Sequence, residues 1–135
     1  MHASRVELLP SGMSVAQTSV VCNRIIPAMS VAECSIQARD SYENVIPSSA
    51  RVANMFLGKI EFQVGSRIIQ NHAFNPRVVL GSGNGEYLLR YRSPSRQSSL
   101  TVNIFSRYES SNGEVVISHL PQGIFNVTVK ESILN

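Results

Sequence analysis

Alternation of apolar and polar residues dominates the chain and predicts β-strands. In KIEFQV, residues 59–64, every second side chain is apolar, and SLTVNIF, residues 99–105, and IFNVTVKE, residues 124–131, follow the same rule. This period of two buries one face of a sheet and leaves the other face in water. Further short strands are expected at residues 6–9, 18–26, 31–38, 68–70, 78–80, 86–92 and 115–120.

Turn-forming residues separate these strands. Asn84-Gly85 and Asn112-Gly113 are typical of tight hairpin turns, and PQG at residues 121–123 predicts a turn between two strands. About eight to ten short strands with such punctuation indicate an all-β fold, an antiparallel β-sandwich that includes the jelly roll among its types. No linker or low-complexity segment divides the chain, so residues 1–135 are expected to form a single domain.

One segment departs from the alternation. SSARVANMFLG, residues 48–58, offers Ser48 or Ser49 as a helix N-cap, apolar residues at helical spacing and Gly58 as a stop signal. We expect one short α-helix near residues 49–57, covering one end of the sheets.

The register of residues 86–92 against 99–107 predicts a hairpin. Both segments alternate, and a single register satisfies every apolar position. Its pairs are Tyr91 with Leu100, Leu89 with Val102, and Tyr87 with Ile104. The glycine-rich GSGNG at residues 81–85 is then a turn rather than a phosphate-binding loop, because a strand and Glu86 follow it where a helix and Lys-Ser or Lys-Thr would be needed.

Charge changes the picture only slightly. The net charge of the 135 residues is +3, with ten arginines and two lysines. The candidate basic patch comprises Arg90, Arg92, Arg96 and Arg107. Such a patch could bind single-stranded nucleic acid, but the predicted register buries Tyr87 and Tyr91 on the other face and removes the aromatic stacking platform. Nucleic acid is therefore an alternative rather than the favoured partner.

Cys22 and Cys34 are the two cysteines. If residues 18–26 and 30–38 form a hairpin centred near Ala28, the two cysteines lie directly opposite each other, as do Val20 and Ile36, so this candidate cross-strand pair could form a disulfide. No signal peptide is visible, so we favour two reduced, buried thiols and a cytoplasmic or virion-associated protein over a classically secreted one. No apolar run reaches the roughly 18 residues of a membrane span.

No constellation typical of catalysis or metal binding stands out. The sequence lacks a Gly-x-Ser-x-Gly elbow and any closely spaced Cys or His pair, and His72 and His119 have no obvious partner. We therefore expect no enzymatic activity, no metal and no cofactor. Candidate binding loops are marked by Ser82, Asn84, Ser95 and Asn112.

Residues 111–132, SNGEVVISHLPQGIFNVTVKES, resemble the closing strands of Cna-B-like and transthyretin-like repeats, in which a Leu-Pro-x-Gly turn precedes an alternating final strand. The resemblance covers about one-sixth of the chain and implies a structural or adhesive sandwich. Our functional hypothesis is a non-catalytic domain that self-assembles, or binds protein partners, through sheet edges and loops, as a virion or surface-appendage component would. A carbohydrate-binding, lectin-like module is a second alternative.

Overall fold

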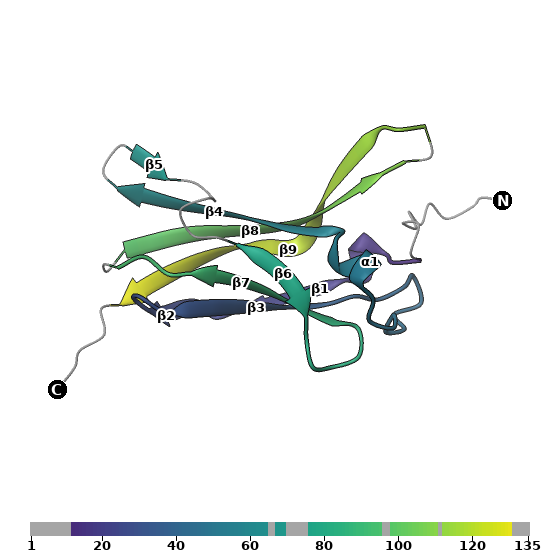
Figure 1. Ribbon diagram of the computed structural model, residues 1–135, viewed down its shortest axis with the longest axis horizontal. Coiled ribbons are helices and arrows are strands. Elements are labelled where there is room, and N and C mark those ends of the chain that lie inside the picture. The colour runs from purple at the N-terminus through teal and green to yellow at the C-terminus, as the bar shows by residue number, and fades with distance from the viewer. Residues whose placement is uncertain (1–11, 65–66, 70–75, 96–97, 111, 131–135) are drawn as a thin grey trace.

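The computed structural model describes residues 12–64, 67–69, 76–95, 98–110 and 112–130. Within these ranges the chain is built almost entirely from β-strands, with one short α-helix and one turn of 3-10 helix (Figure 1). The elements are η1 Val15–Gln17, β1 Ser19–Cys22, β2 Ile25–Pro27, β3 Val31–Gln37, α1 Ala50–Ala53, β4 Phe56–Val64, β5 Arg67–Ile69, β6 Arg77–Leu80, β7 Glu86–Arg92, β8 Ser98–Glu109 and β9 Val115–Lys130. The strand predicted at residues 6–9 lies outside the described residues.

The described strands form two sheets that pack face to face. One sheet has the order β1-β3-β7-β6, and the other has the order β2-β9-β8-β4-β5. All neighbouring strands are antiparallel except β2 and β9, which are parallel. The single strand predicted at residues 18–26 is in fact two, because the chain leaves the first sheet after Cys22 and joins the second at Ile25.

Alternate side chains of both sheets fill the space between them. Ile36 and Leu89 from the first sheet, and Ile60 and Val102 from the second, are fully buried. Their sequence neighbours point outward, as the burial pattern along β7 shows. The all-β sandwich predicted from alternation is therefore confirmed.

The hairpin predicted between residues 86–92 and 99–107 is wrong. β7 pairs with β3 and β6 in the first sheet, whereas β8 pairs with β4 and β9 in the second. The polar segment between β7 and β8 carries the chain from one layer to the other. Tyr91 and Leu100 are both buried as expected, but they belong to opposite walls of the core instead of adjacent strands.

The predicted helix is present but shorter than expected. α1 spans Ala50–Ala53, and the Ser49 hydroxyl accepts a hydrogen bond from the Val52 N–H at 3.1 Å, so Ser49 is the N-cap of the two serines that the sequence offered. Gly58 is not a stop signal, because the chain is already in β4 from Phe56. Gly58 instead faces the core, where a Cβ atom would lie 2.7 Å from both δ-carbons of Leu89.

The turn predicted at residues 121–123 is also wrong, because β9 continues through it. From Asn103 to Phe105, β8 advances two residues, while β9 passes from Ile124 back to His119, a step of five. β9 therefore carries three extra residues as a bulge. Gln122 has φ 54° there, a left-handed conformation that lets the chain bend without ending the strand. The bulge lets the β8–β9 pair extend past the body of the sandwich.

Candidate interaction surfaces

The three described arginines of the predicted basic patch, Arg90, Arg92 and Arg107, do not share one sheet. Arg90, on the outer face of β7, forms an ion pair with Glu33 on the neighbouring strand β3. Arg92 is exposed at the end of the same strand, and Arg107 lies on β8 in the other sheet. Arg96 lies outside the described residues. The described members of the set are thus divided between two sheets, and one of them is neutralised.

The predicted binding loops lie at opposite ends of the molecule. The β6–β7 loop, which holds Ser82 and Asn84, and the β8–β9 turn, which holds Asn112, lie at one end, whereas the β7–β8 connection with Ser95 lies at the other (Figure 1). Two of these side chains stabilise the loops themselves: Asn84 Oδ1 accepts from the Ser48 N–H at 3.4 Å, and Asn112 Oδ1 accepts from the Glu114 N–H at 3.3 Å. They do not converge on one ligand.

Cys22 and Cys34 lie directly opposite each other on β1 and β3, in the register that also pairs Val20 with Ile36. Their Cα atoms are 4.2 Å apart, and a disulfide joins the two residues where we had favoured reduced thiols. Both cysteines are buried against the core. Because β1 has no second neighbour in its sheet among the described strands, the disulfide covalently anchors an edge strand of the described sheet.

The described residues show no cluster of side chains arranged for catalysis or metal binding. His119 is exposed and stacks obliquely on Phe105, with ring centroids 6.2 Å apart, and His72 lies outside the described residues. No group of three potential metal-ligating side chains occurs in the described ranges. Tyr91 lies in the core, and burial raises the pKa of its hydroxyl to about 12.

A loop carboxylate escaped the sequence reasoning. Hydrogen bonds from the Asn44 N–H at 2.9 Å and the Tyr42 N–H at 2.8 Å lower the pKa of Asp40, and the Asn44 bond has the larger effect. The Asp-x-Tyr-x-Asn spacing is a signal for such a side-chain-to-backbone turn. The role of Asp40 is to close the turn that follows β3.

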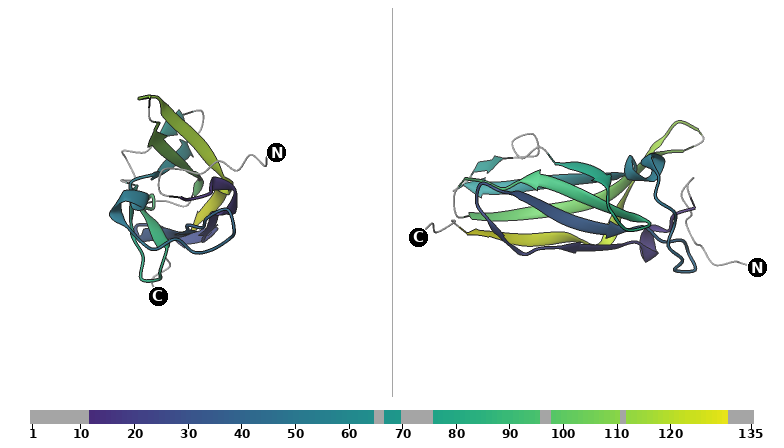
Figure 2. Two further views of the ribbon diagram at one scale, coloured as in Figure 1. Left: turned by 90° about the vertical axis from the view of Figure 1, so that its right-hand side faces the viewer. Right: turned by 60° about the horizontal axis from the view of Figure 1, so that its bottom comes forward.

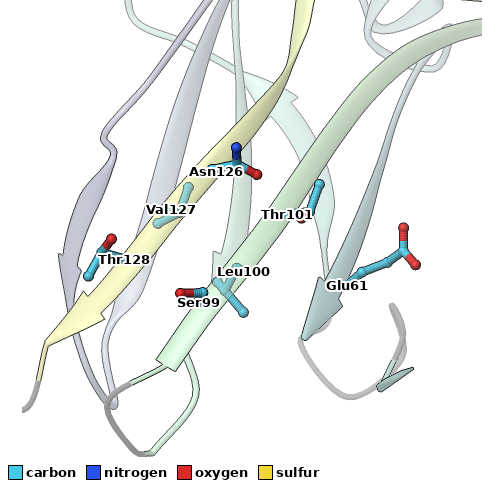
Figure 3. A pocket seen from close by; sticks show the side chains of 7 residues that line it. All are labelled: Glu61, Ser99, Leu100, Thr101, Asn126, Val127 and Thr128. Carbon is cyan, nitrogen blue, oxygen red and sulfur yellow. The ribbon is translucent and has the colours of Figure 1, made fainter. Parts of the chain in front are cut away.

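A pocket of about 290 Å³ lies on the outer face of the second sheet, over β4, β8 and β9 (Figure 3). The register places Glu61, Thr101 and Asn126 in one row across these strands. Figure 3 shows the Glu61 carboxylate extending away from Thr101 and Asn126. None of the described residues that line this pocket is aromatic, so they offer no stacking surface of the kind expected of a carbohydrate site.

A second pocket, of about 320 Å³, lies where the turn between β2 and β3 meets the end of β7. Its walls combine apolar and polar side chains with one guanidinium group. It is lined by Met29, Ser30, Val31, Arg92, Ser93 and Ser95.

Beyond the end of β4 at Phe56, the β8–β9 pair projects from the sandwich as a two-stranded ribbon, which we call the β8–β9 arm, residues 107–109 and 115–117 (Figures 1 and 2). Val115 and Ile117 are 51% and 56% exposed on the arm. Over Val115–His119, β9 has β8 on one side and, among the described residues, no strand on the other. Sequence reasoning missed this edge because it expected a turn at residues 121–123.

Comparisons with known proteins support the architecture. No family model matches the sequence, and no curated protein matches it. The structure is similar to the crystal structure of the Lin-41 filamin domain, with a TM-score of 0.61 and 16% sequence identity over 89% of this chain and 98% of that chain. This fold is an immunoglobulin-like β-sandwich. Among the described residues, no helix has the length and apolarity required to cross a bilayer.

Proposed function

We propose that this immunoglobulin-like sandwich is a non-catalytic interaction domain that binds an extended protein segment by strand addition to the free edge of β9, at Val115–His119. The observation that carries the proposal is the combination of a strand without a second neighbour in the described part of the chain and two exposed aliphatic side chains, Val115 and Ile117. A strand edge of this kind is a template for another chain.

Strand addition uses both features of this edge. Backbone N–H and C=O groups of the incoming segment supply affinity, and alternate side chains supply specificity by packing beside those of the edge strand. On the arm, Ile117 and Val115 lie on the same face, two residues apart, opposite Arg107 and Glu109 of β8. The edge therefore favours a segment with an apolar residue at every second position.

A second copy of the chain is a candidate for the same edge. Ile117 is the central residue of Val115–His119, so two copies paired antiparallel there would place Ile117 opposite Ile117. Such isologous pairing requires only that the same surface be present on both subunits. The experiment below separates this outcome from binding to a different protein.

Selection of a displayed library of short random peptides on the immobilised chain tests the proposal. We expect enriched peptides with alternating apolar residues, and we expect them to slow hydrogen exchange of the amides at residues 115–119. Ile117→Lys should weaken binding at least tenfold. Leu80→Lys is the matched control, because Leu80 is 50% exposed on the edge strand β6.

Sedimentation velocity over a concentration range tests the second copy, and Ile117→Lys should then abolish any dimer. The proposal fails if no peptide is enriched and the chain stays monomeric at all concentrations. It also fails if Leu80→Lys, rather than Ile117→Lys, removes binding.

A further inference from the structure

The turn between β2 and β3 holds an exposed side chain in an unfavourable backbone conformation. Met29 has φ 56°, in the left-handed region that favours glycine, and its side chain is 80% exposed. An L-residue with a long side chain adopts this conformation only where its surroundings enforce it. Neither burial of the side chain nor freedom of the backbone explains the methionine at this position.

Hydrogen bonds to two other segments hold the turn in place. The Met29 N–H donates to the Pro94 carbonyl at 3.0 Å, and the Ala28 N–H donates to the Lys130 carbonyl at 2.8 Å. Ser93 makes a second clamp, because its Oγ accepts from the Ser30 N–H and donates to the Pro27 carbonyl, both at 2.8 Å. The turn is therefore a rigid platform that presents Met29 to solvent.

The surface around Met29 combines apolar area with a cationic side chain, that of Arg92. Val31 is 63% exposed, and the register of β3 on β7 places it opposite Arg92. In the described part of the chain Arg92 makes no ion pair, whereas Arg90, two residues before it, is paired with Glu33. The pocket of about 320 Å³ brings Met29, Val31 and Arg92 onto its walls.

We propose that Met29, Val31 and Arg92 form a binding site, separate from the β9 edge, for a protein segment in which an aliphatic side chain neighbours a carboxylate. The aliphatic group packs against the thioether of Met29 and the methyl groups of Val31, since methionine adapts its shape to varied apolar partners. The carboxylate accepts hydrogen bonds from the Arg92 guanidinium, whose planar fork matches a carboxylate.

The geometry favours a peptide over an anionic membrane. The site is a concave pocket with the exposed Ser95 side chain on its wall beside Arg92, which suits a short segment with its own hydrogen-bonding groups. A membrane surface attracts clusters of several cations. Among the described residues that line the pocket, Arg92 is the one cation.

Nuclear magnetic resonance titration of the whole, isotopically labelled chain tests this site. The probes are two panels of short peptides: one has Leu, Ile, Val or Phe beside Asp or Glu, and the matched panel has Asn or Gln in place of the acid. We expect the acidic panel to shift the amide signals of residues 29–31 and 92–93. We expect the neutral panel to bind about tenfold more weakly, as loss of a charged hydrogen bond requires.

Two variants and a control assign the effect to the pocket. Met29→Gly removes the side chain while favouring the observed φ, so the fold is retained. Arg92→Gln should reduce affinity for the acidic panel to that for the neutral panel, and Arg51→Gln, which changes an exposed arginine of α1 outside both proposed sites, should change nothing. The site is refuted if neither panel shifts these amides at millimolar peptide, or if both panels bind equally.

The same variants separate the alternative occupant. Co-sedimentation with phosphatidylserine-containing vesicles that is lost in Arg92→Gln, without peptide binding, would assign the pocket to a lipid surface and overturn the proposal. The signals of residues 115–119 report on the β9 edge independently, so failure at one site is distinguishable from failure at the other.

Discussion

Gly58 provides the sharpest test of how the two sheets meet. It lies in β4, and a Cβ atom there would approach the Cδ1 and Cδ2 atoms of Leu89 to 2.7 Å and the Cγ atom to 3.3 Å. Leu89 belongs to β7 in the other sheet and is fully buried. This contact crosses the core, and it exists only if β7 packs over β4 instead of pairing with β8.

Whether Gly58→Ala raises or lowers the free energy of unfolding should depend on the side chain at position 89. In the natural background, forcing a methyl group into a close-packed core costs about 1–3 kcal/mol. The lower backbone entropy of alanine in the unfolded chain offsets about 0.5–1 kcal/mol of that cost, so we expect a net destabilisation of about 1 kcal/mol. Leu89→Ala alone should cost about 2–5 kcal/mol through the cavity it leaves. In the Leu89→Ala background the clash is gone, and Gly58→Ala should be stabilising.

Urea unfolding of the four proteins of this double-mutant cycle, with the disulfide intact, measures the coupling free energy directly. Gly123→Ala is the control, because its Cβ would lie 2.6 Å from the backbone oxygen of Ile104, which truncation of Leu89 does not relieve. Equal destabilisation by Gly58→Ala in both backgrounds would show that Leu89 is not its neighbour. The packing of β7 over β4 would then be wrong.

Three further predictions concern stability. The Cys22–Cys34 disulfide spans a sequence separation of 12, and its reduction should lower the free energy of unfolding by about 3 kcal/mol, because the unfolded chain gains entropy. Calorimetry should show a lower Tm after reduction, whereas the Tm of the double Cys→Ala variant should not respond to reductant. Because burial raises the folded-state pKa of Tyr91 to about 12 from its usual value of 10.0, its contribution to stability is complete below pH 10 and is lost between pH 10 and 12. In Tyr91→Phe, the urea midpoint of unfolding should therefore change less between pH 10 and pH 12 than it does in the natural protein. Ser49→Ala should lower the free energy of unfolding by about 1 kcal/mol, because it removes the hydroxyl that accepts the Val52 N–H, and Ser49→Gly should lower it by only a few tenths. Equal losses in the two variants would contradict the capping role.

Local patterns were sufficient where the interacting residues are close in sequence. The register of Cys22 against Cys34 and the N-cap at Ser49 follow from short segments whose partners lie nearby along the chain. Alternation also identified the buried side chains of β7 and β8, including Tyr91 and Leu100. Each inference needs only the two-residue period of a strand, or the capping preference of serine, and both are properties of the local backbone.

The candidate surfaces depended on contacts that no local pattern specifies. The predicted arginine patch was divided because Arg107 belongs to the other sheet, and the exposed edge of β9 arose because the Pro-Gln-Gly segment formed a bulge within a continuous strand. The platform under Met29 depends on Ser93 and Lys130, which are distant in sequence.

The sequence by itself determined that this chain buries every second residue in a β-sandwich, because strand periodicity sorts side chains between core and solvent whichever strands become neighbours. Only the tertiary structure decided which strands share a sheet. If β7 and β8 paired as a hairpin, one register would bury all their apolar side chains. Placing the two strands in opposite sheets buries the same side chains, so removal of apolar surface from water does not distinguish the two arrangements. The edges and pockets available to partners follow from that second choice.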